Sequence, residues 1–316
     1  MVSPVSISMI AVAWVICIMF YGTYLDTAVI VFVAASNSSA SDQEMKALQE
    51  TGWWSTTDTS NTSSPCELQG ISCTNSGSVT QINLANSYLK GTLKLKFSSF
   101  PYLYFVDLHG NGLQGSIPSG IGTLSNLAFL DLSFNHLRGE IPLSMASLTK
   151  LNRLTISSSK IHGSIPSEIG NMKNLNNLDL SWNKISGSIP KGIGNLKNLM
   201  RLDLSSNNLI GSIPTTLAGC SNLQELLLSH NNLTAQFLHR LADLHSLSTI
   251  DLSRNFFSGE MPVLIGNTGY LSILNLSYNK FIGNISISLN NIKVVDLSYN
   301  STSLTRTTVV TGTYLA

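Results

Sequence analysis

Charge is scarce in this sequence of 316 residues. Only 11% of the residues are charged, and the formal net charge is +1. There is no run of basic residues anywhere in the chain. The composition therefore predicts no binding to nucleic acid and no basic segment for a membrane surface.

Motifs that carry catalysis are also missing from the sequence. Its six histidines show no H-E-x-x-H spacing for a metal ion. The G-x-S-x-G of a serine nucleophile does not occur, and neither do the V-A-I-K, H-R-D and D-F-G of a kinase. The sequence predicts a protein that is not an enzyme and that has no metal or other cofactor.

One stretch does have the spacing of a nucleotide-binding loop. Gly110, Gly112 and Gly115 in HGNGLQGSIP form a G-x-G-x-x-G. Such a loop opens a helix, whereas Pro118 follows here within three residues and argues against one. The stretch also recurs, as in LDLSFNHLRGEIP, LDLSWNKISGSIP and LDLSSNNLIGSIP. It therefore indicates a repeat and not a nucleotide site.

The repeat has a period of 24 residues. We use the asparagine of L-x-L-x-x-N, or the serine that replaces it, to mark each coil: Ser87, Asn111, Asn135, Ser159, Asn183, Asn207, Asn231, Asn255 and Asn279, with Asn300 following after 21 residues. A fixed period of this size predicts one solenoid with a continuous core.

The first 35 residues form an apolar leader, in which Asp26 is the only charged side chain. Small residues Val33 and Ala35 fit a signal peptide cleaved before Ser36, although no basic residue precedes the apolar run. The alternative is an uncleaved helix, because Val5 to Gly22 approaches the ~20 residues that span a bilayer. In both cases we expect the chain to enter the secretory pathway and to be extracellular or to face outward from the cell membrane.

The cysteines and sequons agree with export. Cys66 and Cys73 lie close together before the repeats and predict a disulfide, while Cys220 replaces a core leucine of other coils and predicts a buried thiol. Six N-x-S/T sequons predict glycosylation at Asn37, Asn61, Asn232, Asn275, Asn284 and Asn300.

Residues 36–79 are predicted to cap the first coil, which would otherwise expose its core. Ser41 and Glu44 have the spacing of a helix capping box, and Gly52 is expected to end that helix. Trp53 and Trp54 follow and are expected to cover the core, with ligand binding as the alternative. We expect a polar loop over 55–64 and the first strand within SVTQINL.

The repeat and cap together resemble a known family. Residues 41–300 are similar to the ectodomains of plant leucine-rich-repeat receptor proteins and receptor kinases, whose repeat is L-x-x-L-x-L-x-x-N-x-L-x-G-x-I-P. The cap resembles the A-L-x-x-x-G-W-W subgroup through Ala47, Leu48, Gly52, Trp53 and Trp54. It departs from the usual C-x-W-x-G-V-x-C, with Leu68 for tryptophan and Ile71 for valine.

The resemblance implies an α/β solenoid with a concave parallel sheet and about ten coils over residues 80–300, followed by an irregular tail over 301–316. It also implies a second small sheet beside the first. Leucines point inward on each strand, and the marker asparagines are expected to turn inward and satisfy backbone groups at the bend. Ser87 and Ser159 should weaken that ladder, and the coil after Asn231, which lacks the Gly and Pro, should be irregular.

We expect binding on the concave face. Aromatic and arginine side chains are common interface anchors, and six of them are predicted to form a patch across coils 111 to 207: Phe105, Phe129, Phe134, Arg153, Trp182 and Arg201. The alternative is that these aromatics only shield one another. A glycan on Asn275 would obstruct the far end of this face. The aspartates four residues before each marker are too regular to indicate a ligand contact.

The sequence thus predicts a non-catalytic recognition protein that binds a peptide, a cell-wall fragment or a co-receptor. The resemblance leaves two alternatives, a secreted polygalacturonase-inhibitor-like protein and a membrane-tethered interaction scaffold. After the last coil the sequence has neither an apolar span nor a second cysteine pair. We therefore expect either that a partner covers this end or that the chain is a truncated product.

Overall fold

A computed structural model describes residues 40–234, 241, 243–260, 270–282 and 292–301. The predicted leader, the sequons Asn37 and Asn284 and the tail after Ser301 lie outside these described residues. Within the described ranges, no helix is long and apolar enough to cross a membrane.

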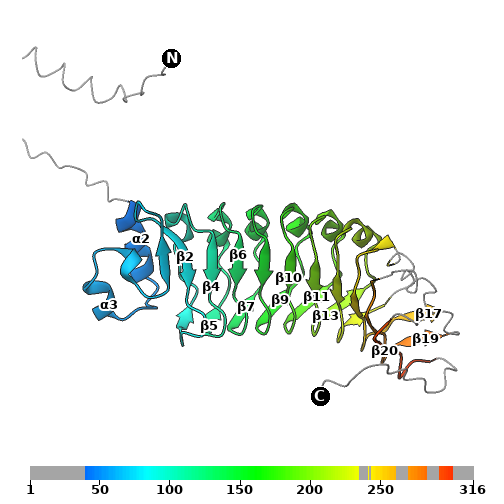
Figure 1. Cartoon of the computed structure of the whole chain (residues 1–316). Coiled ribbons are helices and arrows are strands. Elements are labelled where there is room, and N and C mark those ends of the chain that lie inside the picture. Colours follow the sequence, from blue (N-terminus) through cyan, green and yellow to red (C-terminus); the bar gives the residue numbers. More distant parts are fainter. Residues whose placement is uncertain (1–39, 235–240, 242, 261–269, 283–291, 302–316) are drawn as a thin grey trace, which may run out of the picture. The chain divides into compact units, whose positions relative to one another are not determined.

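The predicted solenoid and its long sheet are confirmed (Figure 1). Each coil contributes one three- to five-residue strand, and neighbouring coils pair in parallel, as Leu130, Leu154 and Leu178 do. The order of strands is β1 (Ile71–Cys73), β2 (Val79–Asn83), β4 (Phe105–Asp107), β6 (Phe129–Asp131), β8 (Arg153–Thr155), β10 (Asn177–Asp179), β12 (Arg201–Asp203), β14 (Glu225–Leu227), β16 (Thr249–Asp251), β18 (Ile273–Asn275) and β20 (Val294–Asp296).

A second parallel sheet follows the marker residues, as expected. It consists of β3 (Lys90–Thr92), β5 (Gly112–Gly115), β7 (His136–Gly139), β9 (Lys160–Gly163), β11 (Lys184–Gly187), β13 (Asn208–Gly211) and β15 (Asn232–Leu233). This sheet ends at β15, in the coil that lacks the usual glycine and proline. Further on, β17 (Ser258–Glu260) pairs with β19 (Lys280–Ile282) as a separate ribbon.

Short 3₁₀ helices return the chain from the second sheet to the long sheet. Five of them start directly after the proline of G-x-I-P, whose fixed φ suits the residue that precedes a helix. They are η3 (Ser119–Thr123), η4 (Leu143–Ser147), η5 (Ser167–Asn171), η6 (Lys191–Asn195) and η7 (Thr215–Gly219). Two three-residue 3₁₀ helices precede them, η1 (Pro65–Glu67) in the cap and η2 (Phe97–Ser99) in the first coil.

The core runs along the stack between these layers. Leu154, Leu178 and Leu202 are fully buried, and each contacts its equivalent in the next coil through the register of the long sheet. Complete burial of one such side chain stabilises by about 1.5–3 kcal/mol. The free energy of the fold is therefore spread over many equivalent coils.

The asparagine ladder has the structural role expected of it. Asn183 accepts a hydrogen bond from the N–H of Ile161 (3.0 Å) and donates to the carbonyls of Ile156, Leu180 and Ser181. The ladder is interrupted at Ser159, whose buried hydroxyl has no partner. A serine is too short to replace the amide of its neighbours.

A second asparagine ladder, which the sequence analysis did not identify, lies before the long sheet. Each of its side chains donates to a backbone carbonyl 25 residues earlier, at 2.7–3.1 Å. Its members are Asn126, Asn174, Asn198 and Asn222. The coils are therefore tied together on both sides of the long sheet.

The cap contains helix α2 (Ala40–Gln49), but the predicted capping box is wrong. The helix begins before Ser41, and Glu44 is fully buried and accepts a hydrogen bond from the N–H of Val79 in the first coil (2.9 Å). Glu44 thus joins the cap to the solenoid. The end of the helix near Gly52 is confirmed, since that glycine has a φ of 68°.

Two further features of the cap differ from the prediction. The polar segment 55–64 is not a simple loop, because Ser55 and Asp58 form a capping box that starts helix α3 (Thr56–Ser60). Strand β1 pairs antiparallel with β2, so the long sheet begins one strand before the predicted start.

The disulfide of the cap is confirmed, since Cys66 and Cys73 are bonded with their Cα atoms 5.8 Å apart. Trp53 and Trp54 pack partly buried against the core with ring centroids 6.2 Å apart, and the indole N–H of Trp54 donates to the carbonyl of Gln69. This packing is the covering role expected of the two tryptophans.

Candidate functional site

The first residue of each long-sheet strand lies beside its equivalent in the next coil. Phe105 pairs with Phe129, Phe129 with Arg153, and Arg153 with Asn177 across β4 to β10. Neighbouring strands lie about 4.7–4.9 Å apart. Residues 24 apart in the sequence therefore form a continuous row on this face.

Three of the predicted site residues form one contact group in that row. The rings of Phe105 and Phe129 stack with centroids 4.4 Å apart and an interplanar angle of 12°. The guanidinium of Arg153 lies 5.7 Å from the centroid of Phe129, within the range of a cation–π interaction. This group offers a ligand both an aromatic surface and a positive charge.

Arg201 lies two strands further on and is held by two carboxylates. It forms ion pairs with Asp203 (3.0 Å) and with Glu225 of the next coil. Burial raises the pKa of Asp203, and the nearby Asp179 raises it further, whereas hydrogen bonds from Ser205 and the charge of Arg201 lower it. Arg201 is thus already neutralised, and a ligand carboxylate would have to compete for it.

Phe134 and Trp182 occupy a second row, one residue before the ladder. Both have positive φ, 52° and 53°, and both side chains are largely exposed, at 57% and 65%. The ring of Phe134 contacts the ring of His109 in the preceding coil, with centroids 5.1 Å apart. The structure therefore separates the six predicted residues into two rows, one at each end of the strands.

The aspartates between these rows have a structural explanation. Asp179 accepts hydrogen bonds from the N–H and the hydroxyl of Ser181, and Asp131 and Ser133 make the same contacts. Carboxylates in this arrangement hold the turn that follows each strand. Their regularity along the chain is consistent with this role.

A third aromatic group near the C-terminal coils was not among the predicted site residues. Tyr278 and Tyr299 stack with centroids 4.2 Å apart, and the guanidinium of Arg254 lies 4.2 Å from the ring of Tyr278. The last coil is only 21 residues long, so the 24-residue period did not align Tyr299 with this row. Tyr278 and Tyr299 each lie one residue before a marker asparagine, and this shared position in the repeat could have identified the group from the sequence.

The described sequons differ in their surroundings. Asn61 and Asn232 are exposed, whereas Asn275 lies half-buried on β18. The side-chain carbonyl of Asn275 accepts hydrogen bonds from the N–H and the hydroxyl of Ser277. Asn300 is a ladder residue whose amide donates to three carbonyls. A glycan on Asn300 would compete with those hydrogen bonds, and glycosylation at each site stays a prediction.

Candidate residues for other chemistry do not gather in the described part of the chain. No group of three His, Cys, Asp or Glu there could hold a metal ion. Cys220 is fully buried, and burial raises the pKa of its thiol to about 11. That thiol is an unreactive core group, as predicted.

Leucine rich repeat family models match residues 102–124, 126–148 and 174–196, and also 187–233 and 197–257. None of the curated proteins matches the chain. Among solved structures, the chain is similar to the ectodomain of the Arabidopsis thaliana receptor kinase GASSHO1/SCHENGEN3 in complex with CASPARIAN STRIP INTEGRITY FACTOR 2. The identity is 34% and the TM-score 0.73, over 75% of this chain and 29% of that chain.

Two further structures show the range of similar proteins. The Arabidopsis receptor kinase HAESA, in complex with the peptide hormone IDA and the co-receptor SERK1, is 30% identical with a TM-score of 0.64, over 82% of this chain and 50% of that chain. A plant ice-binding protein is 27% identical with a TM-score of 0.56, over 77% of this chain and 86% of that chain. The chain spans at most half the length of the two receptor chains.

Proposed function

Because this chain is a leucine-rich-repeat protein similar to plant receptor-kinase ectodomains, we propose that it is an extracellular recognition protein. Its ligand is a peptide or a small protein that binds on the face of the long sheet. The aromatic side chains and Arg153 supply the anchors.

The observation that carries this proposal is the exposure of large aromatics where the fold does not need them. Trp182 and Phe134 occupy a backbone position that Gly110 or Ser158 fills in neighbouring coils. A bulky residue with positive φ is conformationally unfavourable, and an exposed side chain gains little from burial. A binding role accounts for these side chains, because exposed aromatics are frequent hot spots of interfaces.

The similar receptor structures also support a ligand-binding role for this chain. The HAESA ectodomain was solved with a bound peptide hormone and a co-receptor, and the GASSHO1/SCHENGEN3 ectodomain with CASPARIAN STRIP INTEGRITY FACTOR 2. The ice-binding protein shows that this fold also serves a different function. The proposal for this chain therefore depends on its own long-sheet residues.

The test is a selection of random linear peptides displayed on phage against the secreted protein, followed by calorimetric titration of the enriched peptides. We expect Phe129→Ser combined with Trp182→Ser to weaken binding at least tenfold, about 1.4 kcal/mol. The matched control is Tyr88→Ser combined with Phe256→Ser, which removes two exposed aromatics beside the second sheet. If none of the enriched peptides depends on Phe129 and Trp182, the proposal is wrong.

A further inference from the structure

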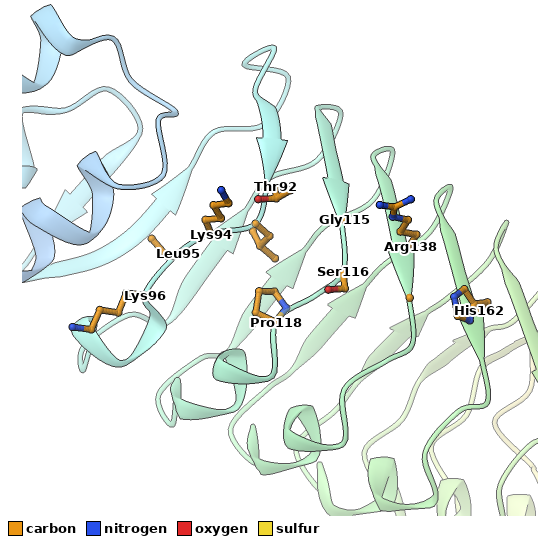
Figure 2. A pocket seen from close by; sticks show the side chains of 11 residues that line it. Thr92, Lys94, Leu95, Lys96, Gly115, Ser116, Pro118, Arg138 and His162 are labelled. Atoms are coloured by element: carbon orange, nitrogen blue, oxygen red, sulfur yellow. The ribbon is translucent and has the colours of Figure 1, made fainter.

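A hollow of about 760 Å³ lies on the second-sheet side of the first four coils. Its lining includes Lys94, Lys96, Arg138 and His162, together with small residues such as Gly115 and Ser116. Figure 2 shows Lys94, Arg138 and His162 on the first, third and fourth coils, with Gly115 and Ser116 of the second coil between Lys94 and Arg138. The residues around this hollow lie away from the long sheet and its aromatic rows.

The hollow arises because the first coil departs from the repeat. Lys94 occupies the position of the proline that precedes the 3₁₀ helix in the next five coils, as Pro118 does in the second. The 3₁₀ helix of the first coil, Phe97–Ser99, has three residues, whereas η3 to η7 have five each. The segment Leu93–Lys96 therefore leaves space beside Gly115 and Pro118 and places two lysines at its rim.

Further cations continue from the hollow along the second sheet. We define the basic face as the exposed side chains of Lys90, Lys94, Lys96, His136, Arg138, Lys160, His162 and Lys184. Arg138 is the direct strand partner of Lys160, and His162 is the direct strand partner of Lys184. The like charges of Arg138 and Lys160 repel each other.

These charges are not neutralised within the described part of the chain. The ion pairs of Arg201 with Asp203 and Glu225 lie on the long sheet and involve none of these residues. Glu140 is a carboxylate on the same side, and its side chain lies over Gly163 without forming an ion pair. The repulsion between neighbouring cations would be relieved by a bound anion.

Strands β3 to β15 of the second sheet carry lysine, arginine and histidine but no aspartate or glutamate. Six of the 18 lysines and arginines of the chain lie on the basic face, within five consecutive coils. The long sheet instead carries a row of carboxylates: Asp107, Asp131, Asp179, Asp203, Asp251 and Asp296. The basic face therefore carries six formal positive charges, although the net charge of the chain is +1.

We propose that the basic face binds a linear acidic polysaccharide that carries a carboxylate on each sugar. Lysine or arginine occurs on β3, β7, β9 and β11, a span of about 20 Å at the usual strand spacing, so these cations match a ligand whose charges also recur along its length. The exposed ring of Tyr88, at 91%, lies two residues from Lys90 and can stack on a sugar.

An acidic protein fits this surface less well. Protein interfaces are centred on buried aromatic or aliphatic anchors. The outward residues of β5 to β11 are instead glycine, polar or charged: Gly112, Gln114, His136, Arg138, Lys160, His162, Lys184 and Ser186. Recognition here rests on charged and polar side chains, which suits a hydrated polysaccharide.

The test measures calorimetric binding of α-1,4-linked oligogalacturonate to the secreted protein at about 0.15 M salt. We expect Lys94→Gln combined with Arg138→Gln to weaken binding at least tenfold. The matched control, Lys173→Gln combined with Lys293→Gln, removes the same charge elsewhere and should bind as the unaltered protein does. Higher salt should weaken binding, because screening shortens the reach of exposed charges.

Three results would overturn the inference. They are equal binding by the two double variants, equal binding of the methyl-esterified oligosaccharide, and binding of polyglutamate to the same residues with equal affinity, which would indicate an acidic protein partner. The variant with Phe129→Ser and Trp182→Ser should still bind oligogalacturonate. Failure of the peptide proposal and failure of this one are therefore distinguishable.

Discussion

The residue before each ladder position is the point where this fold tolerates the widest choice of side chain. Its φ lies between 51° and 67° from Asn86 to Tyr299, whether the residue is glycine, serine, asparagine, arginine, histidine or an aromatic. The hydrogen bonds of the ladder fix the turn, so they offset the cost of a left-handed conformation, about 1–2 kcal/mol for a residue with a Cβ. Recognition can therefore vary here without changing the backbone.

A second residue-scale feature is the buried carboxyl of Glu44. One of its oxygens accepts from Val79, whereas the other is buried without a partner. Burial raises the pKa of Glu44 above its ordinary value of 4.5, and the hydrogen bond from Val79 opposes this only in part. A raised pKa means that the folded protein holds the proton more tightly than the unfolded chain does.

We therefore predict that Glu44 makes the protein less stable as pH rises. Its stabilising contribution is complete below about pH 4.5 and is lost as pH rises through the raised pKa. The thermal midpoint of the unaltered protein should fall relative to that of Glu44→Gln between about pH 4 and pH 7. Glu50→Gln, at an exposed position of the cap, serves as the control. Parallel pH profiles for the unaltered protein and Glu44→Gln would contradict this prediction.

Among the elements, the 3₁₀ helices pack closely because particular glycines face the next coil. A Cβ on Gly194 in η6 would overlap the carbonyl oxygen of Thr216 in η7. A Cβ on Gly120 in η3 would meet only the ring of Phe97, at 3.6 Å, which is an ordinary contact. The two glycines lie in equivalent helices but face different surroundings.

Gly194→Ala should therefore destabilise the protein by about 2 kcal/mol, since overpacking forces neighbouring backbone apart. Gly120→Ala should change the free energy of unfolding by less than about 0.5 kcal/mol. Urea unfolding followed by circular dichroism compares the two variants. Equal effects would show that glycine is required in these helices for its flexibility and not for the close approach of coils.

The stacking of the coils could be predicted from the sequence, although the second asparagine ladder was missed, whereas several contacts of the cap could not. The long sheet and the marker-asparagine ladder follow from the 24-residue period, because equivalent side chains pack in the same way in each coil. The second sheet was expected from the family resemblance. Helix α3, the antiparallel β1 and the contact of Glu44 with Val79 depend on how one cap meets one coil. Because these contacts occur only once, the repeat pattern of the sequence could not predict them.

The candidate site shows the same division. The row from Phe105 to Arg201 follows from the period, and the structure places these residues in register. The ion pairs of Arg201 depend on side-chain conformation, which a repeat pattern does not specify. The hollow beside Lys94 was missed because it results from a departure from the repeat.

At the scale of the whole molecule, the solenoid is a one-dimensional array in which each coil contacts its neighbours. Damage at one end should therefore remain local unless the coupling between coils transmits it. The disulfide between Cys66 and Cys73 lies at the N-terminal end of the array, and the buried Cys220 lies several coils away. These two sites allow local and global opening to be measured in one molecule.

We predict that Cys66→Ala combined with Cys73→Ala destabilises the cap by about 2–3 kcal/mol, the value typical of a short disulfide loop. Hydrogen exchange should then accelerate in β1 and β2 but not in β10 to β14. Because the pKa of the Cys220 thiol is raised to about 11, this thiol is protonated near pH 8 and is labelled by iodoacetamide only when its coil opens. Its labelling should stay as slow as in the unaltered protein. Faster labelling together with uniform loss of protection would mean instead that the coils unfold as one cooperative unit, and that the cap stabilises all of them.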